Sequence, residues 1–189
     1  MPKVTPKVIH CRAGPEGRNG HVPYPFAVTM RLTLHTDYAL RLLMLLAMEP
    51  DRLHTIEEVA RRHDISRNHL MKVTQTLTQS GFVESLRGRG GGLRLAREAA
   101  AIVLGDVVRA TEDSFALVEC LDPGRNTCIL ATACGLRGPI EAALAAFLAV
   151  LDGYSLADLI RSPGTLRQMR RLLTEVTVLP PQATVGDTA

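Results

Sequence analysis

Hydrophobic positions in the first half of the chain recur with the spacing of helices and are separated by short polar turns. The stretch "TDYALRLLMLLAM", which starts at Thr36, is almost entirely apolar and predicts a buried first helix. The segment "TIEEVARRH" predicts a second helix that ends near His63. Its Thr55 and Glu58 form a capping box, because the hydroxyl can accept from the backbone N–H of Glu58 while the carboxylate reaches back to the cap.

A third helix and a hairpin follow. Ser66 is a good cap for "RNHLMKVTQTLTQS", and Gly81 is a natural end for it. Two short helices joined by a tight turn predict a helix-turn-helix. Beyond Gly81, "FVESL" can pair with "GLRLA" across the glycine-rich "RGRGG", which predicts a hairpin with a basic tip. A helix-turn-helix with such a hairpin is a winged helix, so we expect a mainly α fold with a small β-wing.

The second half carries two further amphipathic segments. The stretch "LGDVVRATE" predicts a short helix with Leu104, Val107 and Val108 on one face. After Pro139, apolar residues follow the spacing i, i+3, i+4, i+7, i+8 and i+11. These residues are Ile140, Ala143, Leu144, Phe147, Leu148 and Leu151. A long helix with one apolar stripe needs a partner surface, so we expect a C-terminal dimerisation helix that pairs with a second copy of the chain.

These patterns divide the chain into segments. Residues 1–29 hold five prolines and three glycines among scattered charges, which predicts a disordered N-terminal extension. Two interpretations of it stay open: translation that starts at Met30, or a genuine flexible arm. The other predicted segments are a winged helix-turn-helix DNA-binding domain at 30–100, a short helix and cysteine-containing loop at 101–135, the dimerisation helix and a C-terminal turn at 136–162, and a flexible tail at 163–189.

The composition narrows the choice of compartment and core. Hydrophobic residues make up 46% of the chain but aromatics only 4%, which favours packed helices rich in Leu, Ala and Val. No run approaches the roughly 20 apolar residues of a membrane span, and the N-terminus lacks the apolar stretch of a secretory signal. We therefore expect no membrane contact and a cytoplasmic location. Thiols stay reduced there, so clustered cysteines indicate metal or redox chemistry.

The net charge of +3 permits nucleic-acid binding without requiring it, so the placement of the basic residues decides. Recognition helices insert their N-terminal residues into the major groove, where Arg and Asn bond to base edges. A solvated polar helix face would explain that part alone. The basic, glycine-rich hairpin tip adds phosphate contacts, and together the two features predict binding to double-stranded DNA. The predicted DNA-binding residues are Ser66, Arg67, Asn68, His69, Lys72, Arg87, Arg89 and Gly90.

Three of the four cysteines, Cys120, Cys128 and Cys134, lie in one segment with the spacing C-x7-C-x5-C. A reducing compartment disfavours a disulfide, zinc sites usually contain closer cysteine pairs, and no base for a nucleophilic cysteine lies nearby. An iron–sulfur cluster tolerates wide spacing and a ligand other than thiolate. The spacing leaves a cluster and a zinc site both open, and Cys11, in the predicted disordered extension, is a poor fourth ligand.

Several stretches together closely resemble the NsrR-type nitric-oxide-sensing repressors, which are winged-helix iron–sulfur regulators of a family that also includes IscR. They are "MRLTLHTDYALRLLMLLA", "SRNHLMKV", "GFVESLRGRGGGLRL", "LGDVVRATE" and the cysteine segment, in this order from Met30 to about Ile160. The resemblance implies a homodimer joined through the long helix that represses transcription from a palindromic operator. Because the chain also lacks a P-loop and a Gly-rich dinucleotide fingerprint, we do not expect an enzyme.

The resemblance also implies the cluster ligands. Cys120, Cys128 and Cys134 of one subunit would hold the cluster, with Asp37 donated by the partner subunit, and [4Fe-4S] is favoured over [2Fe-2S]. From the residues alone, Asp37 would be interpreted as a charge that stabilises the start of a helix. Carboxylate oxygen is a hard, weak ligand of such an iron. Nitric oxide would therefore attack there, and nitrosylation would release the operator.

Two departures from the family pattern keep alternatives open. Arg137 stands where the IscR branch has a histidine ligand, and the stretch "LDPGRNT" lengthens the first cysteine gap. His35 and His69 stay alternative ligands if the site differs from the expected one. The leading prediction is a nitric-oxide-sensing repressor. The alternatives are an iron- or redox-sensing regulator of the same fold and a zinc-stabilised DNA-binding module.

Overall fold

The computed structural model describes residues 31–122 and 124–175. The chain separates into two units, Met1–Arg31 and Leu32–Ala189, and the described elements belong to the second. The extension predicted at residues 1–29 lies outside the described residues. Within the described ranges, no helix combines the length and apolar character needed to cross a membrane.

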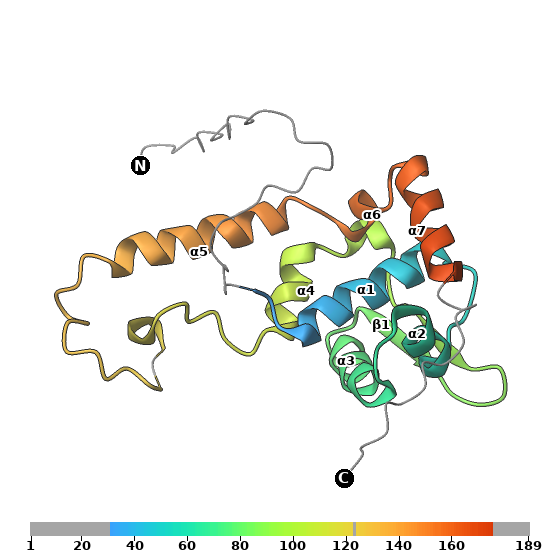
Figure 1. Ribbon diagram of the computed structural model, residues 1–189, viewed down its shortest axis with the longest axis horizontal. Coiled ribbons are helices and arrows are strands. Elements are labelled where there is room, and N and C mark those ends of the chain that lie inside the picture. Colours follow the sequence, from blue (N-terminus) through green and yellow to red (C-terminus); the bar gives the residue numbers. More distant parts are fainter. Residues whose placement is uncertain (1–30, 123, 176–189) are drawn as a thin grey trace, which may run out of the picture. The chain divides into compact units, whose positions relative to one another are not determined.

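The described part is mainly helical, with one antiparallel pair of strands (Figure 1). This is the winged-helix architecture that the hydrophobic pattern predicts. In chain order the elements are α1 (Leu34–Met48), α2 (Ile56–His63), α3 (Arg67–Gln79), β1 (Val83–Leu86), β2 (Gly92–Leu95), the 3-10 turn η1 (Ala99–Ala101), α4 (Leu104–Thr111), the 3-10 turn η2 (Glu119–Leu121), α5 (Arg137–Asp152), α6 (Leu156–Leu159) and α7 (Pro163–Glu175).

Helix α1 forms the centre of the core and contacts α3, α4, β2 and α6 (Figure 1). Its leucines at 42, 43, 45 and 46 are at most 1% exposed, in agreement with the predicted buried first helix. Each such burial stabilises the fold by about 2 kcal/mol relative to exposure. The start of α1 is fixed to the end of α4, because the buried hydroxyls of Thr36 and Thr111 lie 2.8 Å apart.

The caps of the helix-turn-helix form largely as predicted. The Thr55 hydroxyl accepts from the backbone N–H of Glu58 at 3.1 Å, and α2 ends at His63. The expected return bond from the Glu58 carboxylate to the cap is wrong. That carboxylate instead pairs with Arg52 at 2.7 Å and with Arg62 at 3.5 Å. Charge-assisted bonds to a guanidinium are stronger than a bond to a neutral amide, so the carboxylate binds the two arginines instead of the backbone N–H.

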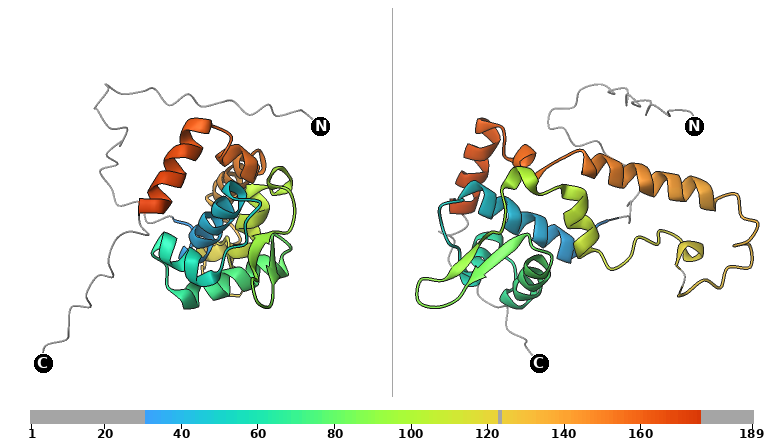
Figure 2. Two further views of the ribbon diagram at one scale, coloured as in Figure 1. Left: turned by 90° about the vertical axis from the view of Figure 1, so that its right-hand side faces the viewer. Right: turned by 180° about the vertical axis from the view of Figure 1, so that it is seen from behind.

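The wing consists of β1 and β2, paired antiparallel from Val83 opposite Leu95 to Leu86 opposite Gly92. His54 adds an isolated bridge to Leu93, which attaches the wing to the segment before α2. The loop that joins the strands projects away from the helices (Figure 2). Glycine is required in this loop at Gly90, whose φ of +82° lies in the left-handed region.

Helix α5 begins at Arg137, so that Pro139 lies in its first turn as the pattern predicts, and it ends at Asp152. It packs against α4, where Arg109 binds Asp152 through two bonds of 2.8 and 2.6 Å. Within the described part of the chain, α5 buries none of its own residues. The apolar stripe predicted from the sequence is therefore only partly covered: Ile140, Leu144, Leu148 and Leu151 are partly buried, and Ala143 and Phe147 are exposed.

The prediction of a flexible tail from residue 163 onwards is wrong for its first part. Residues 163–175 form helix α7, which contacts α2. Leu166, Met169 and Leu173 lie on one face of α7 and pack against the core, which explains the helix. The Arg170 guanidinium donates to the Met48 carbonyl at 2.5 Å and so binds the end of α1. Residues 176–189 lie outside the described residues.

Candidate DNA-binding face and cysteine segment

The first turn of α3 presents polar side chains to solvent. Ser66, Arg67, Asn68, His69 and Lys72 are all exposed, while the opposite face of the helix is buried through Leu70, Val73 and Leu77. The Ser66 hydroxyl accepts from the backbone N–H of His69 at 3.3 Å and so fixes the start of the helix. A recognition helix needs this division, because its N-terminal residues must reach base edges while its other face is held by the core.

Arg67 is not free in the structure. Its guanidinium donates to the Glu57 carboxylate of α2 at 2.7 Å, with both side chains 58% exposed. This bond lowers the pKa of Glu57. An exposed pair of this kind is weak and easily exchanged. DNA phosphate or a base edge would therefore have to displace Glu57, and sequence spacing did not reveal this competition.

The wing tip is the second basic surface. Arg87 and Arg89 are exposed, and neither forms an ion pair with another described residue. The next arginine along the wing, Arg94, is already paired with Glu84 at 2.8 Å across the strands. Arg87, Arg89 and the backbone at Gly90 are therefore the parts of the wing that are available to an anion.

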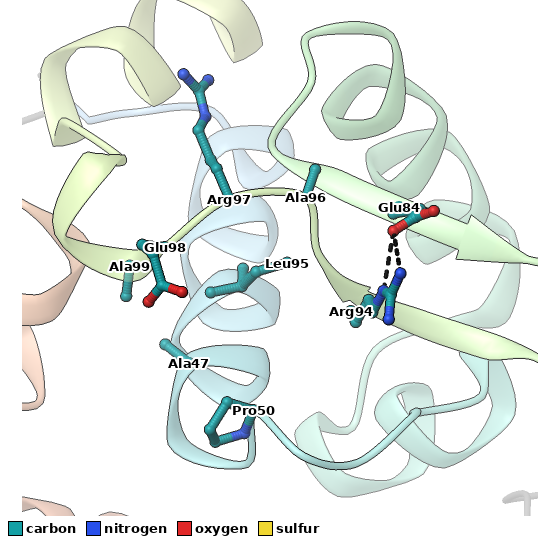
Figure 3. Close-up of a pocket in the computed structure, with 9 residues that line it drawn as sticks. All are labelled: Ala47, Pro50, Glu84, Arg94, Leu95, Ala96, Arg97, Glu98 and Ala99. Atoms are coloured by element: carbon teal, nitrogen blue, oxygen red, sulfur yellow. Dashed lines mark hydrogen bonds and ion pairs between the residues drawn. The ribbon is translucent and has the colours of Figure 1, made fainter.

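A pocket of about 430 Å³ lies where the wing strands meet the end of α1 (Figure 3). Its charged side chains include Glu84 and Arg94, which bind each other. Arg97, also on its wall, lies 4.7 Å from the centre of the Phe82 ring. Because these side chains already bind partners within the protein, we do not interpret the pocket as a ligand site. Its side chains instead hold the wing strands in place.

A cluster of charged side chains surrounds His54, the residue that forms the bridge to Leu93 of the wing. Arg62, 8% exposed, donates to Glu49 at 2.7 Å and to Glu58 at 3.5 Å. The bond from Arg62 lowers the pKa of Glu49. The fully buried His54 lies 3.6 Å from Glu49, and its ring nitrogens have no hydrogen-bond partner among the described residues. Burial lowers the pKa of His54, so the ring is neutral at pH 7.

The cysteines lie between α4 and α5, in a segment whose described residues contain only the short turn η2 as helix. Cys120, Cys128 and Cys134 are free thiols and partly exposed. Across residues 31–122 and 124–175, the structure brings no three His, Cys, Asp or Glu side chains together as a metal site. Neither the three cysteines nor Asp37 therefore form a complete site within the described part of one chain.

The chemistry of these donors nevertheless fits an iron–sulfur cluster, since cysteine thiolates are its usual ligands and none of the three cysteines is in a disulfide. Arg137, at the start of α5 beyond Cys134, binds the Glu141 carboxylate at 2.9 Å, which raises the pKa of Arg137. His35 donates to or accepts from Thr76 at 3.1 Å, so a protein contact already occupies this alternative ligand.

Asp37 lies in the first turn of α1. Arg41, one turn later, binds both of its oxygens, at 2.7 and 3.2 Å, and the two side chains are 41% and 44% exposed. Arg41 also lies over the Tyr38 ring, and Tyr38 in turn contacts His69 of α3. Sequence analysis did not predict the pair of Asp37 and Arg41, although their i, i+4 spacing was a usable signal.

Comparison with known proteins identifies the family of this chain. The Rrf2 family profile, described as an iron-dependent transcriptional regulator, matches residues 32–162. The chain belongs to the Rrf2 family. Members with a helix-turn-helix regulate transcription by binding DNA, so this Rrf2 protein is a DNA-binding transcriptional regulator. Its relatives are regulators, which confirms the prediction that it is not an enzyme.

Individual relatives agree with the assignment. The HTH-type transcriptional regulator NsrR of Bacillus subtilis (strain 168) is 46% identical over 144 residues, which cover 76% of this chain and 99% of the relative. Protein aau3 of Rhizobium meliloti (strain 1021) is 47% identical over 133 residues, which cover 70% of this chain and 86% of the relative. The resemblance to NsrR-type regulators is thereby confirmed.

Solved structures confirm the winged-helix fold. CymR, the global cysteine regulator of B. subtilis, has a TM-score of 0.55 and 27% identity and covers 69% of this Rrf2 chain and 95% of its own. The T. potens IscR structure has a TM-score of 0.58 at 24% identity, with 72% and 90% covered. The likeness to IscR shows the fold alone.

Proposed function

We propose that this Rrf2 protein is a homodimeric repressor that senses nitric oxide through an iron–sulfur cluster and releases a palindromic operator on nitrosylation. The observation that carries the proposal is a segment with three free, partly exposed cysteines directly after a winged helix, in a chain 46% identical to an NsrR. Because its partner is DNA, we place the protein in the cytoplasm.

On the DNA side, α3 and the wing would bind the operator together. Arg67, Asn68, His69 and Lys72 are exposed at the first turns of α3, where they could reach base edges. Arg87 and Arg89, with the backbone at Gly90, would contact phosphates. Ser66 would act mainly as the cap that fixes the start of α3.

On the sensing side, Cys120, Cys128 and Cys134 would hold the cluster, and Asp37 of the partner subunit would complete the ligands. A bound cluster would supply irons with which nitric oxide can react. The carboxylate of Asp37 is the weakest of the proposed ligands, and Arg41 of its own chain is ready to bind it once it is released. Of the cluster types, we favour [4Fe-4S] over [2Fe-2S].

A homodimer is proposed from α5. The apolar stripe of this helix is only partly covered, with Phe147 37% exposed, and Val150 beside the stripe is 62% exposed. Burying such a stripe against a second copy would remove apolar surface from water, and a two-fold interface would present two winged helices to a palindrome. The same arrangement would let Asp37 of one subunit reach the cysteines of the other.

The proposal is tested by an anaerobic absorbance titration of freshly purified protein with nitric oxide. We expect visible absorbance that bleaches at a fixed stoichiometry, together with loss of operator binding in the same samples. Cys134→Ser should abolish the absorbance, whereas Cys11→Ser, which changes the remaining cysteine, should not. Iron and sulfide analysis then distinguishes [4Fe-4S] from [2Fe-2S]. A colourless protein after reconstitution, with bound zinc, would refute the cluster.

A regulator that senses iron or redox state is the second candidate. The description of the Rrf2 family as iron-dependent favours it. The discriminating result is the response of the coloured protein to nitric oxide. If nitric oxide leaves operator binding unchanged while iron chelation or air abolishes it, the iron- or redox-sensing function replaces the first.

A further inference from the structure

We propose that Met71 on the recognition helix α3 contributes to sequence specificity by contacting the 5-methyl group of a thymine in the operator. The inference rests on the proposed DNA-binding face, because it adds one residue to the exposed side of the same helix. Arg67, Asn68 and Lys72 would make the polar contacts of that face, and Met71 would make an apolar one. Its ligand is a group that only thymine carries among the four bases.

Met71 is exposed on a helix whose other large apolar side chains are buried. Leu70, Val73 and Leu77 are at most 1% exposed and hold α3 in the core, whereas Met71 is 44% exposed. Along Arg67–Gln79 it is the one large apolar side chain that the structure leaves exposed. The helical period explains the difference, because consecutive residues of a helix point about 100° apart and Met71 directly follows Leu70.

The neighbours of Met71 on the helix surface include the predicted DNA-binding residues. Arg67 and Asn68 precede it by four and three residues, so their side chains lie next to it. Lys72 follows it, Gln75 lies one turn further on, and all four side chains are exposed. Groups that bond to bases and phosphates therefore surround the methionine, on the side of α3 that would enter the major groove.

The dimensions of a helix and of DNA limit which base pair Met71 would contact. A helix rises by about 1.5 Å per residue, so Met71 lies about 4.5 Å beyond Asn68 along the axis. Base pairs are about 3.4 Å apart, so the two residues would contact base pairs that are one or two steps apart. Asparagine bonds to adenine, and apolar side chains contact the thymine methyl. Together the two residues favour neighbouring A·T base pairs in each half-site.

Methionine suits such a contact because its side chain is unbranched and its thioether is polarisable, so it adapts to the surface that it meets. Before binding, both the exposed side chain and the thymine methyl are in contact with water. The contact removes apolar surface of both from water. Burial of one methyl-sized group changes affinity by about fourfold.

The competing interpretation is a surface methionine without a partner, since single apolar side chains on protein surfaces are common. Under it, loss of the Met71 side chain changes binding to every DNA sequence alike, and no thymine methyl contributes through this residue. Under the proposal, loss of the side chain and loss of the methyl are not additive, because each removes the same contact.

The first experiment uses the unchanged protein with modified DNA. The full chain, purified without oxygen, selects a duplex from random sequences, and each thymine of this duplex is replaced in turn by deoxyuridine, which lacks only the 5-methyl group. We expect one thymine of a half-site to lose about fourfold in affinity when it is replaced. If no replacement weakens binding, the proposal is overturned.

The second experiment repeats the titration with Met71→Ala. We expect this variant to bind the thymine and deoxyuridine duplexes equally, whereas Met71→Leu keeps a preference for thymine. The control is Leu172→Ala on α7, which removes another exposed apolar side chain, 54% exposed, and should keep the preference of the wild type. An undiminished preference in Met71→Ala would assign the methyl to another residue and so refute the role of Met71.

The variant Asn68→Ala separates failure of this proposal from failure of the DNA-binding face. If it weakens operator binding while Met71→Ala keeps the full preference for thymine, the face stands and the role of Met71 is refuted. If neither substitution changes binding to any duplex, the proposed face and the role of Met71 fail together.

Discussion

The substitution Arg62→Met tests how much the charged cluster of Arg62, Glu49 and Glu58 stabilises the fold. Methionine fills much of the space of the arginine stem but removes the guanidinium that binds Glu49 at 2.7 Å and Glu58 at 3.5 Å. Breaking a buried pair costs roughly 3–5 kcal/mol. Because the two carboxylates are 19% and 16% exposed, water replaces part of the lost interaction, and we expect a loss of about 2–3 kcal/mol at pH 7.

The pH dependence follows from the pKa of Glu49. Arg62 holds this pKa below its ordinary value of 4.5 in the folded protein. Stability from the pair is therefore fully present above pH 4.5 and is lost as the pH falls through the lowered pKa. We expect wild type and Arg62→Met to converge in their free energies of unfolding as the pH is lowered through this range. At pH 7 the difference should be complete.

The assay is urea unfolding followed by circular dichroism at pH 7 and at pH 3.5, with Arg52→Met as the matched control. Arg52 binds the same two carboxylates but is 56% exposed, so its loss should cost less than about 1 kcal/mol. The reasoning is refuted if Arg52→Met costs as much as Arg62→Met. It is equally refuted if the cost of Arg62→Met is the same at both pH values.

Three further predictions follow from other parts of the molecule. Burial lowers the pKa of His63 from 6.5 to about 4, so stability should fall as the pH drops from 6.5 towards 4, and a pH series should show a smaller fall in His63→Gln. Arg89→Ala should weaken operator binding and reduce the salt dependence by about one ion, whereas an unchanged slope in a salt titration would remove the wing contact. Phe147→Glu should give a monomer by light scattering, and a persistent dimer would exclude the α5 interface.

The winged-helix core was predictable because local signals and burial agree there. The run after Thr36 is apolar along most of its length, so it must form a helix that is buried in the core of a small domain. The predicted caps at Thr55 and Ser66 also form in the structure. The wing was predictable for a similar reason, since the glycine at position 90 permits the tight loop that its strands need. Where strong local preferences and packing point the same way, the sequence pattern is sufficient.

Two features were not predictable from local patterns because a tertiary contact decides them. The Glu58 carboxylate binds Arg52 and Arg62 instead of the backbone N–H at the cap. Nothing in the four-residue capping motif shows that these guanidinium groups lie close by. Helix α7 looked weakly patterned, but the core accepts its apolar face and Arg170 binds the end of α1. Isolated short helices are marginal, so packing supplies most of their stability.

The two candidate sites also differ in how far the sequence could predict them. The predicted DNA-binding residues lie at the start of one helix and in the short loop between two strands, so their exposure follows from the pattern. The proposed cluster ligands come from a segment with little regular structure and from the first turn of α1. Residue types can indicate the chemistry of such a site, whereas its geometry depends on the bound group and, in our proposal, on a second chain.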